Sequence, residues 1–223
     1  MVHIRWLAVF IILPLLFTQH LYAEKKDSLN FKQQVYEKQG GNFSVGIRNT
    51  VNLFTDEPKA FGAGAGGSVR LQIVDRVNTE WFGDYISTNL YNKADRMDAH
   101  IGWSVMFYIL DPKGFTRKFT PFVAAGHCFD YTSIRLTGEN QKTYDRLTSA
   151  IHMSVGCHYN ITPRFDISVS TLYVLHLGKE LDANLQSDGS LLVEEHQNAG
   201  WEGHVMLVLS AHYKFMKLWK AKR

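Results

Sequence analysis

The chain has no long apolar segment after its first 23 residues, and this absence limits how it could enter a membrane. A helix that crosses a bilayer needs about 20 consecutive apolar residues, so no later segment qualifies. Every backbone polar group within the hydrocarbon core must also be hydrogen-bonded internally. If the rest of the chain crosses a membrane, it must therefore do so with strands.

The chain is also poor in net charge and in proline. Its formal net charge is +3 at pH 7, and its basic residues are scattered except at Lys25-Lys26 and from Lys214 to Arg223. No basic stripe could follow a phosphate backbone, which argues against nucleic acid as a partner. Only 5 prolines stand beside 17 glycines and 13% aromatic residues, and this composition favours β-structure.

Cysteine is rare, with two in 223 residues. The alternation described below places Cys128 on an inner face and Cys157 on an outer face of adjacent strands. A disulfide between opposite faces would distort both strands. We therefore expect two free thiols with structural roles.

The first 23 residues predict the compartment. A weakly basic start is followed by an apolar run from Trp6 to Phe17, and Leu21-Tyr22-Ala23 offers a small residue for cleavage. About a dozen apolar residues are too few for a membrane anchor, so residues 1–23 are interpreted as a cleaved signal peptide. Residues 24–41 are then expected to form an N-terminal periplasmic segment.

From Asn42 to Phe215 the chain alternates between apolar and polar residues with a period of two, which is the period of a β-strand. The clearest segment runs from Leu147 to Ile161, where most odd-numbered residues are apolar and most even-numbered ones polar. Eight such segments share this parity. We predict an all-β fold, an eight-stranded antiparallel up-and-down transmembrane β-barrel over residues 42–215, with odd-numbered residues facing lipid and a basic tail over 216–223.

The connections between the predicted strands differ in length. Those after the second, fourth and sixth strands are short, whereas longer polar ones occur after the third, fifth and seventh, notably Thr132 to Asp145 and Gly178 to Ala199. Outer-membrane barrels combine short periplasmic turns with longer extracellular loops, so both termini are expected in the periplasm. The alternatives are a lipocalin-like barrel and a soluble β-sandwich, although sandwich strands are usually about five or six residues long.

Three features resemble the small outer-membrane β-barrel family that includes the membrane domain of outer-membrane protein A. They are the strand pattern as a whole, the segment Pro121-Phe122-Val123-Ala124-Ala125-Gly126, and the last strand ending Tyr213-Lys214-Phe215. The resemblance implies a location in the bacterial outer membrane, contact with its lipid, and recognition of the terminal aromatic pair by the barrel-assembly machinery. Ser210 departs from the glycine usual in that signal, and residues 216–223 extend beyond it. The resemblance concerns fold and location, not activity.

Charged residues fall on the predicted inner face. An eight-stranded barrel encloses an interior only wide enough for side chains, where an unpaired charge is costly. Arg70 and Glu80 flank the Asp75-Arg76 turn at nearly equal distances, so we expect them to pair. Such pairs would make a polar plug, and a small pore is the alternative. The inner-face charges are Arg48, Arg70, Glu80, Asp84, Asp130, Asp166 and Glu202.

Histidines also fall on this inner face, but they are spread over four predicted strands without local ligand spacing. We therefore expect hydrogen-bonded structural histidines, with no metal and no cofactor. The six are His100, His152, His158, His176, His204 and His212.

One group of residues has the composition of a hydrolase site. His152 and Ser154 are two residues apart on one predicted strand, and Asp166 is on the next. This arrangement is similar to that of outer-membrane lipid A deacylases, in which serine is the nucleophile, histidine the base and the acid its orienter. Such a site must face the lipid that it cuts, whereas these three residues fall on the inner face. Val155 also follows Ser154 where that family would have asparagine.

The sequence therefore predicts a non-enzymatic outer-membrane protein without catalytic, cofactor-binding or metal residues. Its role is structural, or depends on an extracellular ligand bound by the long loops. A lipid A deacylase-like esterase (His152, Ser154, Asp166) and a small pore are the alternatives.

Overall fold

The computed structural model describes residues 40–53, 61–113, 117–137, 142–178, 180–187, 189–196 and 203–219. The predicted signal peptide, residues 24–39 of the predicted periplasmic segment and Glu202 lie outside these residues.

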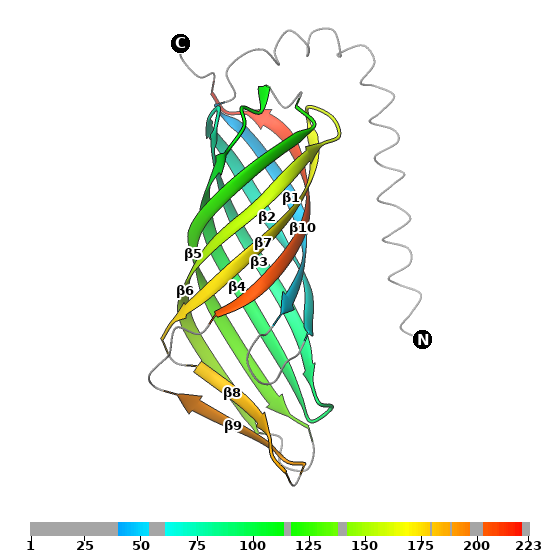
Figure 1. Ribbon diagram of the computed structural model, residues 1–223, viewed down its shortest axis with the longest axis vertical. Coiled ribbons are helices and arrows are strands. Elements are labelled where there is room, and N and C mark those ends of the chain that lie inside the picture. The colour runs from blue at the N-terminus through cyan, green and yellow to red at the C-terminus, as the bar shows by residue number, and fades with distance from the viewer. Residues whose placement is uncertain are drawn as a thin grey trace, which may run out of the picture. The chain divides into compact units, whose positions relative to one another are not determined.

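A closed antiparallel barrel dominates the described part of the chain (Figure 1). β10 pairs with β1 and completes the ring in the order β1-β10-β7-β6-β5-β4-β3-β2. The predicted eight-stranded barrel is confirmed. No helix among the described residues is long and apolar enough to cross a membrane. The barrel strands are β1 (Asn42–Leu53), β2 (Phe61–Val74), β3 (Val77–Leu90), β4 (Ala94–Tyr108), β5 (Phe119–Leu136), β6 (Thr143–Asn160), β7 (Phe165–Leu177) and β10 (Gly203–Lys217).

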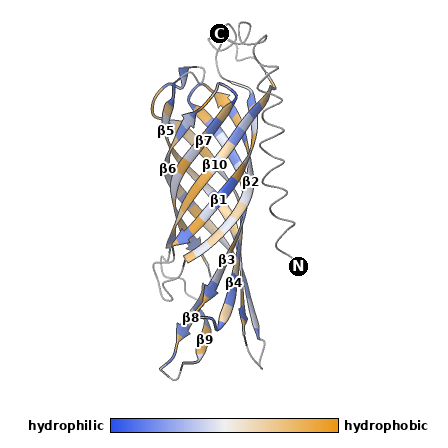
Figure 2. Ribbon diagram, turned by 90° about the vertical axis from the view of Figure 1, so that its right-hand side faces the viewer, coloured by the Kyte–Doolittle hydropathy of each residue, from blue (hydrophilic) through white to orange (hydrophobic). Residues whose placement is uncertain are grey.

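The parity predicted from the sequence holds in the barrel strands. Odd-numbered side chains point outward and even-numbered ones inward; Met153 is 71% exposed, for example, while His152 beside it is 3% exposed. Figure 2 shows hydrophobic and hydrophilic residues succeeding one another along these strands. Because successive side chains of a strand point to opposite faces, the alternation turns one apolar face outward. Cys128 is buried and Cys157 half-buried, and both are free thiols as predicted.

Close contact between neighbouring strands requires glycine at two inner positions. A Cβ on Gly64 would lie 2.0 Å from the carbonyl oxygen of Tyr85, and a Cβ on Gly126 would lie 2.0 Å from that of Trp103. Any side chain there would collide with the backbone of the adjacent strand. Glycine therefore lets β2 and β5 approach their neighbours at these points.

One end of the barrel, named here the turn end, carries the short connections near Asp75, Asp111 and Thr162. The last strand finishes at this end, where the rings of Phe215 and Phe43 meet edge to face at 5.6 Å. β10 continues to Lys217, two residues beyond the predicted limit of the barrel.

The opposite end is more ordered than the sequence suggested. The predicted loop Gly178–Ala199 contains two paired strands, β8 (Glu180–Leu185) and β9 (Leu191–His196). β5 and β6 extend into the predicted loop Thr132–Asp145, leaving a connection of residues 137–142. Loop prediction was wrong here because polarity marks exposure to water, and strands that project from a membrane are exposed as well.

The connection between β3 and β4 is a tight turn where a polar loop was predicted. It comprises residues 91–93, and Tyr91 and Asn92 have φ angles of 54° and 56°. Two successive positive φ angles are typical of a type I′ hairpin turn, whose twist matches that of the flanking strands.

Candidate functional site: the lumen and the head

A buried ion-pair network lies on the inner faces of β1, β2 and β3. Glu80 stands directly opposite Arg70 in the strand register and accepts hydrogen bonds from Arg70 Nε and Arg48 Nη1. Arg48 also donates through Nε and Nη2 to the two carboxylate oxygens of Asp84, each at 3.0 Å. The predicted Arg70–Glu80 pair is confirmed. Arg48 joins it because the curvature of the wall turns the inner faces of β1 and β3 toward each other.

The remaining donors of Arg70 reach the far wall of the lumen. Its Nη1 donates to Asp166 Oδ1 at 3.0 Å, and its Nη2 donates to Ser168 Oγ at 3.1 Å and Ser210 Oγ at 3.3 Å. Asp166 accepts a second charged hydrogen bond from Lys214 Nζ. Three cations and three carboxylates are thereby joined in one balanced network: Arg48, Arg70, Lys214, Glu80, Asp84 and Asp166.

Little space is left between these groups. A cavity of about 20 Å³ lies beside Arg48, Arg70 and Glu80, and one of about 10 Å³ lies toward the turn end beside Asp166 and Lys214. A single water requires about 10–15 Å³ of such space. At this level the lumen has room for isolated waters and is plugged by side chains, as predicted.

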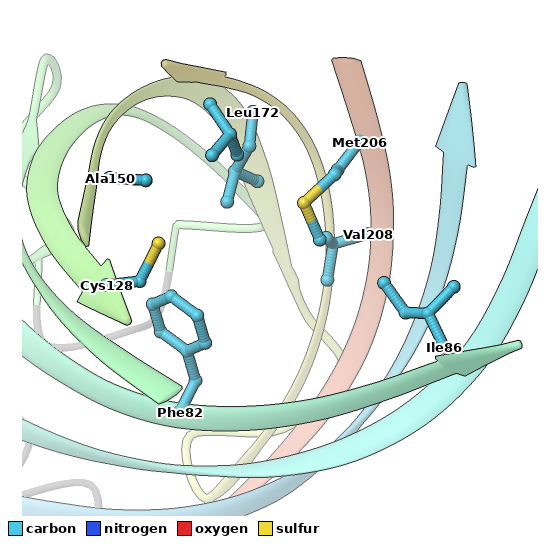
Figure 3. Packing of buried hydrophobic residues seen from close by; sticks show 8 residues of the cluster. Phe82, Ile86, Cys128, Ala150, Leu172, Met206 and Val208 are labelled. Carbon is cyan, nitrogen blue, oxygen red and sulfur yellow. The ribbon is translucent and has the colours of Figure 1, made fainter. Parts of the chain in front are cut away.

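An apolar layer follows the ion-pair network along the lumen. Its side chains project inward from β3, β5, β6, β7 and β10 (Figure 3). Cys128 belongs to this layer and is 2% exposed. Burial in the closed lumen removes these apolar side chains from water, which stabilises their packing. The cluster comprises Phe82, Ile86, Cys128, Ala150, Leu172, Val174, Met206 and Val208.

Three histidines gather around one carboxylate on the head side of this layer. Asp130 Oδ1 lies 3.1 Å from His100 Nε2, and Asp130 Oδ2 lies 3.2 Å from His176 Nδ1. His176 Nε2 is 3.1 Å from His204 Nδ1, so these two imidazoles share a hydrogen bond. Arg146 Nη2 donates to Asp130 Oδ2 at 2.9 Å. These five residues, His100, Asp130, Arg146, His176 and His204, are called the histidine cluster below.

Solved bacterial outer-membrane proteins share this architecture, among them the two that follow. Neisserial surface protein A matches 80% of the chain and 99% of its own length with a TM-score of 0.55 and 16% identity. A major outer membrane protein from Thermus thermophilus matches 78% of the chain and 98% of its own length with a TM-score of 0.54 and 11% identity. The chain has the fold of the small outer-membrane β-barrels. No family model and no curated protein matches the sequence.

The outer surface of this outer-membrane β-barrel suits a lipid environment. Large apolar side chains are exposed around the wall, among them Ile101 at 66%, Val155 at 60% and Val169 at 59%. Exposed apolar surface that continues around a closed wall is stable in contact with lipid, not water. The fold and this surface agree with the outer-membrane location predicted from the sequence.

The lumen of this outer-membrane β-barrel does not assemble the hydrolase group considered from the sequence. His152 and Ser154 line the small cavity beside Arg48, but Asp166 lies opposite Asn160, whereas His152 lies opposite Val174. Eight residues of β7 separate these two levels, about 26 Å along a strand. Asp166 instead binds Arg70 and Lys214, so the predicted catalytic alternative lacks its acid.

A different serine–histidine pair lies on the outer face, where sequence reasoning did not look for one. His127 Nε2 is 2.5 Å from Ser149 Oγ, and the ring of Phe129 meets that of His127 at 5.0 Å. Both residues are odd-numbered, so the parity rule could have revealed polar side chains facing lipid. No carboxylate contact to His127 is found among the described residues. The contact gives His127 Nε2 and Ser149 Oγ a hydrogen-bonding partner within the apolar wall.

The luminal histidines do not converge on a common point as metal ligands would. Among the described residues, no group of three or more histidine, cysteine, aspartate or glutamate side chains has the arrangement needed to hold a metal ion. In the histidine cluster, His176 contacts Asp130 through Nδ1 and contacts His204 through Nε2. Its two ring nitrogens therefore face these two partners and not a shared metal position.

The distal ends of β3–β6 and the β8–β9 hairpin form a second small core outside the barrel, called the head below. Leu181, Ala183 and Val193 from the hairpin pack against Leu90 and Ile134 from the wall, all at least nine-tenths buried. The opposite face of the hairpin is open, and Leu192 is 43% exposed. The head is therefore a packed structure with an exposed outer face.

Proposed function

We propose that the mature chain is a non-enzymatic outer-membrane protein that presents the head at the cell surface and engages an extracellular ligand through it. The packing of the hairpin onto the wall carries this proposal. Burial of apolar surface stabilises the packed hairpin by about 25 cal/mol for each Å² removed from water. A loop that only connects two strands does not need such a core. The plugged lumen supports a scaffold in place of a channel.

Topology is the first test of this proposal. An epitope tag inserted between Ser187 and Gly189, in the turn of the hairpin, should be labelled on intact cells. A tag beside Lys113, in a short connection at the turn end, should be labelled only after the outer membrane is permeabilised. The reverse result would place the head in the periplasm and overturn the proposal.

Conductance is the second test, because it separates a scaffold from the small pore. The ion pairs and the apolar layer should block ions, so the purified barrel in planar bilayers should show no steady conductance at neutral pH. Stable single-channel steps under these conditions would contradict the plugged lumen.

Lipid analysis tests the non-enzymatic part. Overproduction should leave the acyl chains of lipid A unchanged in mass spectra of extracted lipid. The outer-face pair His127–Ser149 provides the sharpest control, since a lost acyl chain that returns in Ser149→Ala would reveal an esterase. The same reversal in Ser154→Ala would assign the activity to the lumen.

A further inference from the structure

The histidine cluster joins five strands of the barrel. His100 is on β4, Asp130 on β5, Arg146 on β6, His176 on β7 and His204 on β10. All five are at least nine-tenths buried. The rings of His100 and His204 are stacked at 5.7 Å, which closes the circle of contacts. The cluster thus ties the wall together on the head side of the apolar layer.

The carboxylates described in and around the cluster already have cationic partners. Asp130 is the carboxylate within it, and Arg146 already compensates its charge. Asp98 on β4 is held by Arg96 at 3.0 Å and by Thr132 at 2.8 Å. Asp84 on β3, opposite His100 in the register, is held by Arg48. Each of these three carboxylates therefore has a cationic partner before any histidine is protonated.

The contact between His176 and His204 depends on protonation directly. A hydrogen bond between two imidazoles needs one ring nitrogen with a proton and one with a free lone pair. If both rings are cationic, both facing nitrogens carry protons and two like charges stand 3.1 Å apart. The buried pair can therefore take up one proton and keep its hydrogen bond, whereas a second proton breaks that bond and adds repulsion between like charges.

We propose that the histidine cluster is an acid-sensitive lock, which holds the head half of the lumen closed at neutral pH and releases it in mild acid. An ordinary imidazole titrates at a pKa of about 6.5, so acid drives protons onto any opened form, in which the rings reach water. The closed form binds fewer protons, and its population must fall as the pH falls. The wall can remain closed by its backbone ladder while the lumen contacts separate.

Cys128 provides a built-in reporter of this opening. It lies on β5 opposite Ala150, which in turn lies opposite His176, so it sits directly beneath the cluster. Its thiol is buried in the closed barrel. In a Cys157→Ser background, 4,4′-dithiodipyridine, which still reacts with thiols in acid, reports access to Cys128 alone.

The experiment compares the labelling rate of the folded barrel in detergent with that of urea-unfolded protein at the same pH. This ratio removes the intrinsic pH dependence of the thiol reaction. Between about pH 7.5 and about pH 5 the ratio should rise at least about tenfold, because local opening becomes frequent. A ratio that stays constant over this range would overturn the proposal.

Variants identify the groups responsible. Glutamine retains hydrogen-bonding capacity but takes up no proton, so His176→Gln and His204→Gln should each flatten the pH response. His158→Gln is the matched control, since His158 is an equally buried luminal histidine that stacks on Phe122 toward the turn end. A response that persists in both cluster variants, or that disappears in His158→Gln alone, would refute the assignment. If a cluster variant fails to fold, the proposal is still tested by the pH response of the wild-type labelling ratio and by its persistence in His158→Gln.

Discussion

Removal of one partner from the Arg70–Glu80 pair should destabilise the barrel strongly. Glu80 forms ion pairs with both Arg70 and Arg48, and all three side chains are buried. The substitution Glu80→Met leaves three cations facing two carboxylates, and Arg70→Met leaves two cations facing three. Breaking a buried pair in this way costs about 3–5 kcal/mol in unfolding free energy.

The double substitution Arg70→Met, Glu80→Met should cost less than either single one. It leaves Arg48 with Asp84 and Lys214 with Asp166, so the remaining charges are balanced. Methionine is flexible enough to fill most of the vacated volume. The sign of the coupling energy between the two substitutions follows from charge balance alone.

Urea unfolding in detergent, with folded and unfolded forms separated by gel mobility, gives the free energies. The reasoning fails if each single variant costs about 1 kcal/mol or less, as expected for a solvent-screened pair. Ion conductance accompanying such a result would show that water fills the lumen at this level.

Two further substitutions test the wall and the head. Gly64→Ala should destabilise the barrel by about 3 kcal/mol in the same urea assay, whereas Gly67→Ala, whose Cβ would meet only Gly46 O at 3.5 Å, should be tolerated; equal effects would contradict the close approach of β2 to β3. Val193→Asp puts a charge into the head core and should make the hairpin sensitive to protease without changing the gel mobility of the barrel. Leu192→Asp, on the exposed face of the hairpin, should leave its protease resistance unchanged. Cleavage of the hairpin in both variants, or in neither, would argue against the packed head.

Much of the barrel could be predicted from local pattern. The parity of the apolar residues gave the strand faces, the inward position of Cys128 and the outward position of Cys157, because the side-chain period of a strand is fixed by backbone geometry. The Arg70–Glu80 pair was also predictable, since two residues at nearly equal distances from a tight turn meet across a hairpin.

Contacts between strands distant in sequence were not predictable in the same way. Arg48 meets Glu80 across an intervening strand, and Asp166 meets Arg70 across the lumen. The separation of Asp166 from His152 depends on the stagger between β6 and β7, which the alternation alone leaves open. A shift of register by two residues preserves every face and changes every partner.

The sequence by itself determined that the chain forms outward-apolar, inward-polar strands, because the period of two is a local property of the extended backbone. Only the tertiary structure decided which charges meet in the lumen, that His100 and His176 both contact Asp130, and that the β8–β9 hairpin packs on the wall. Those arrangements depend on how the ring closes and how far each strand is shifted against the next, and closure joins Asn42 to Lys217, residues at opposite ends of the barrel sequence.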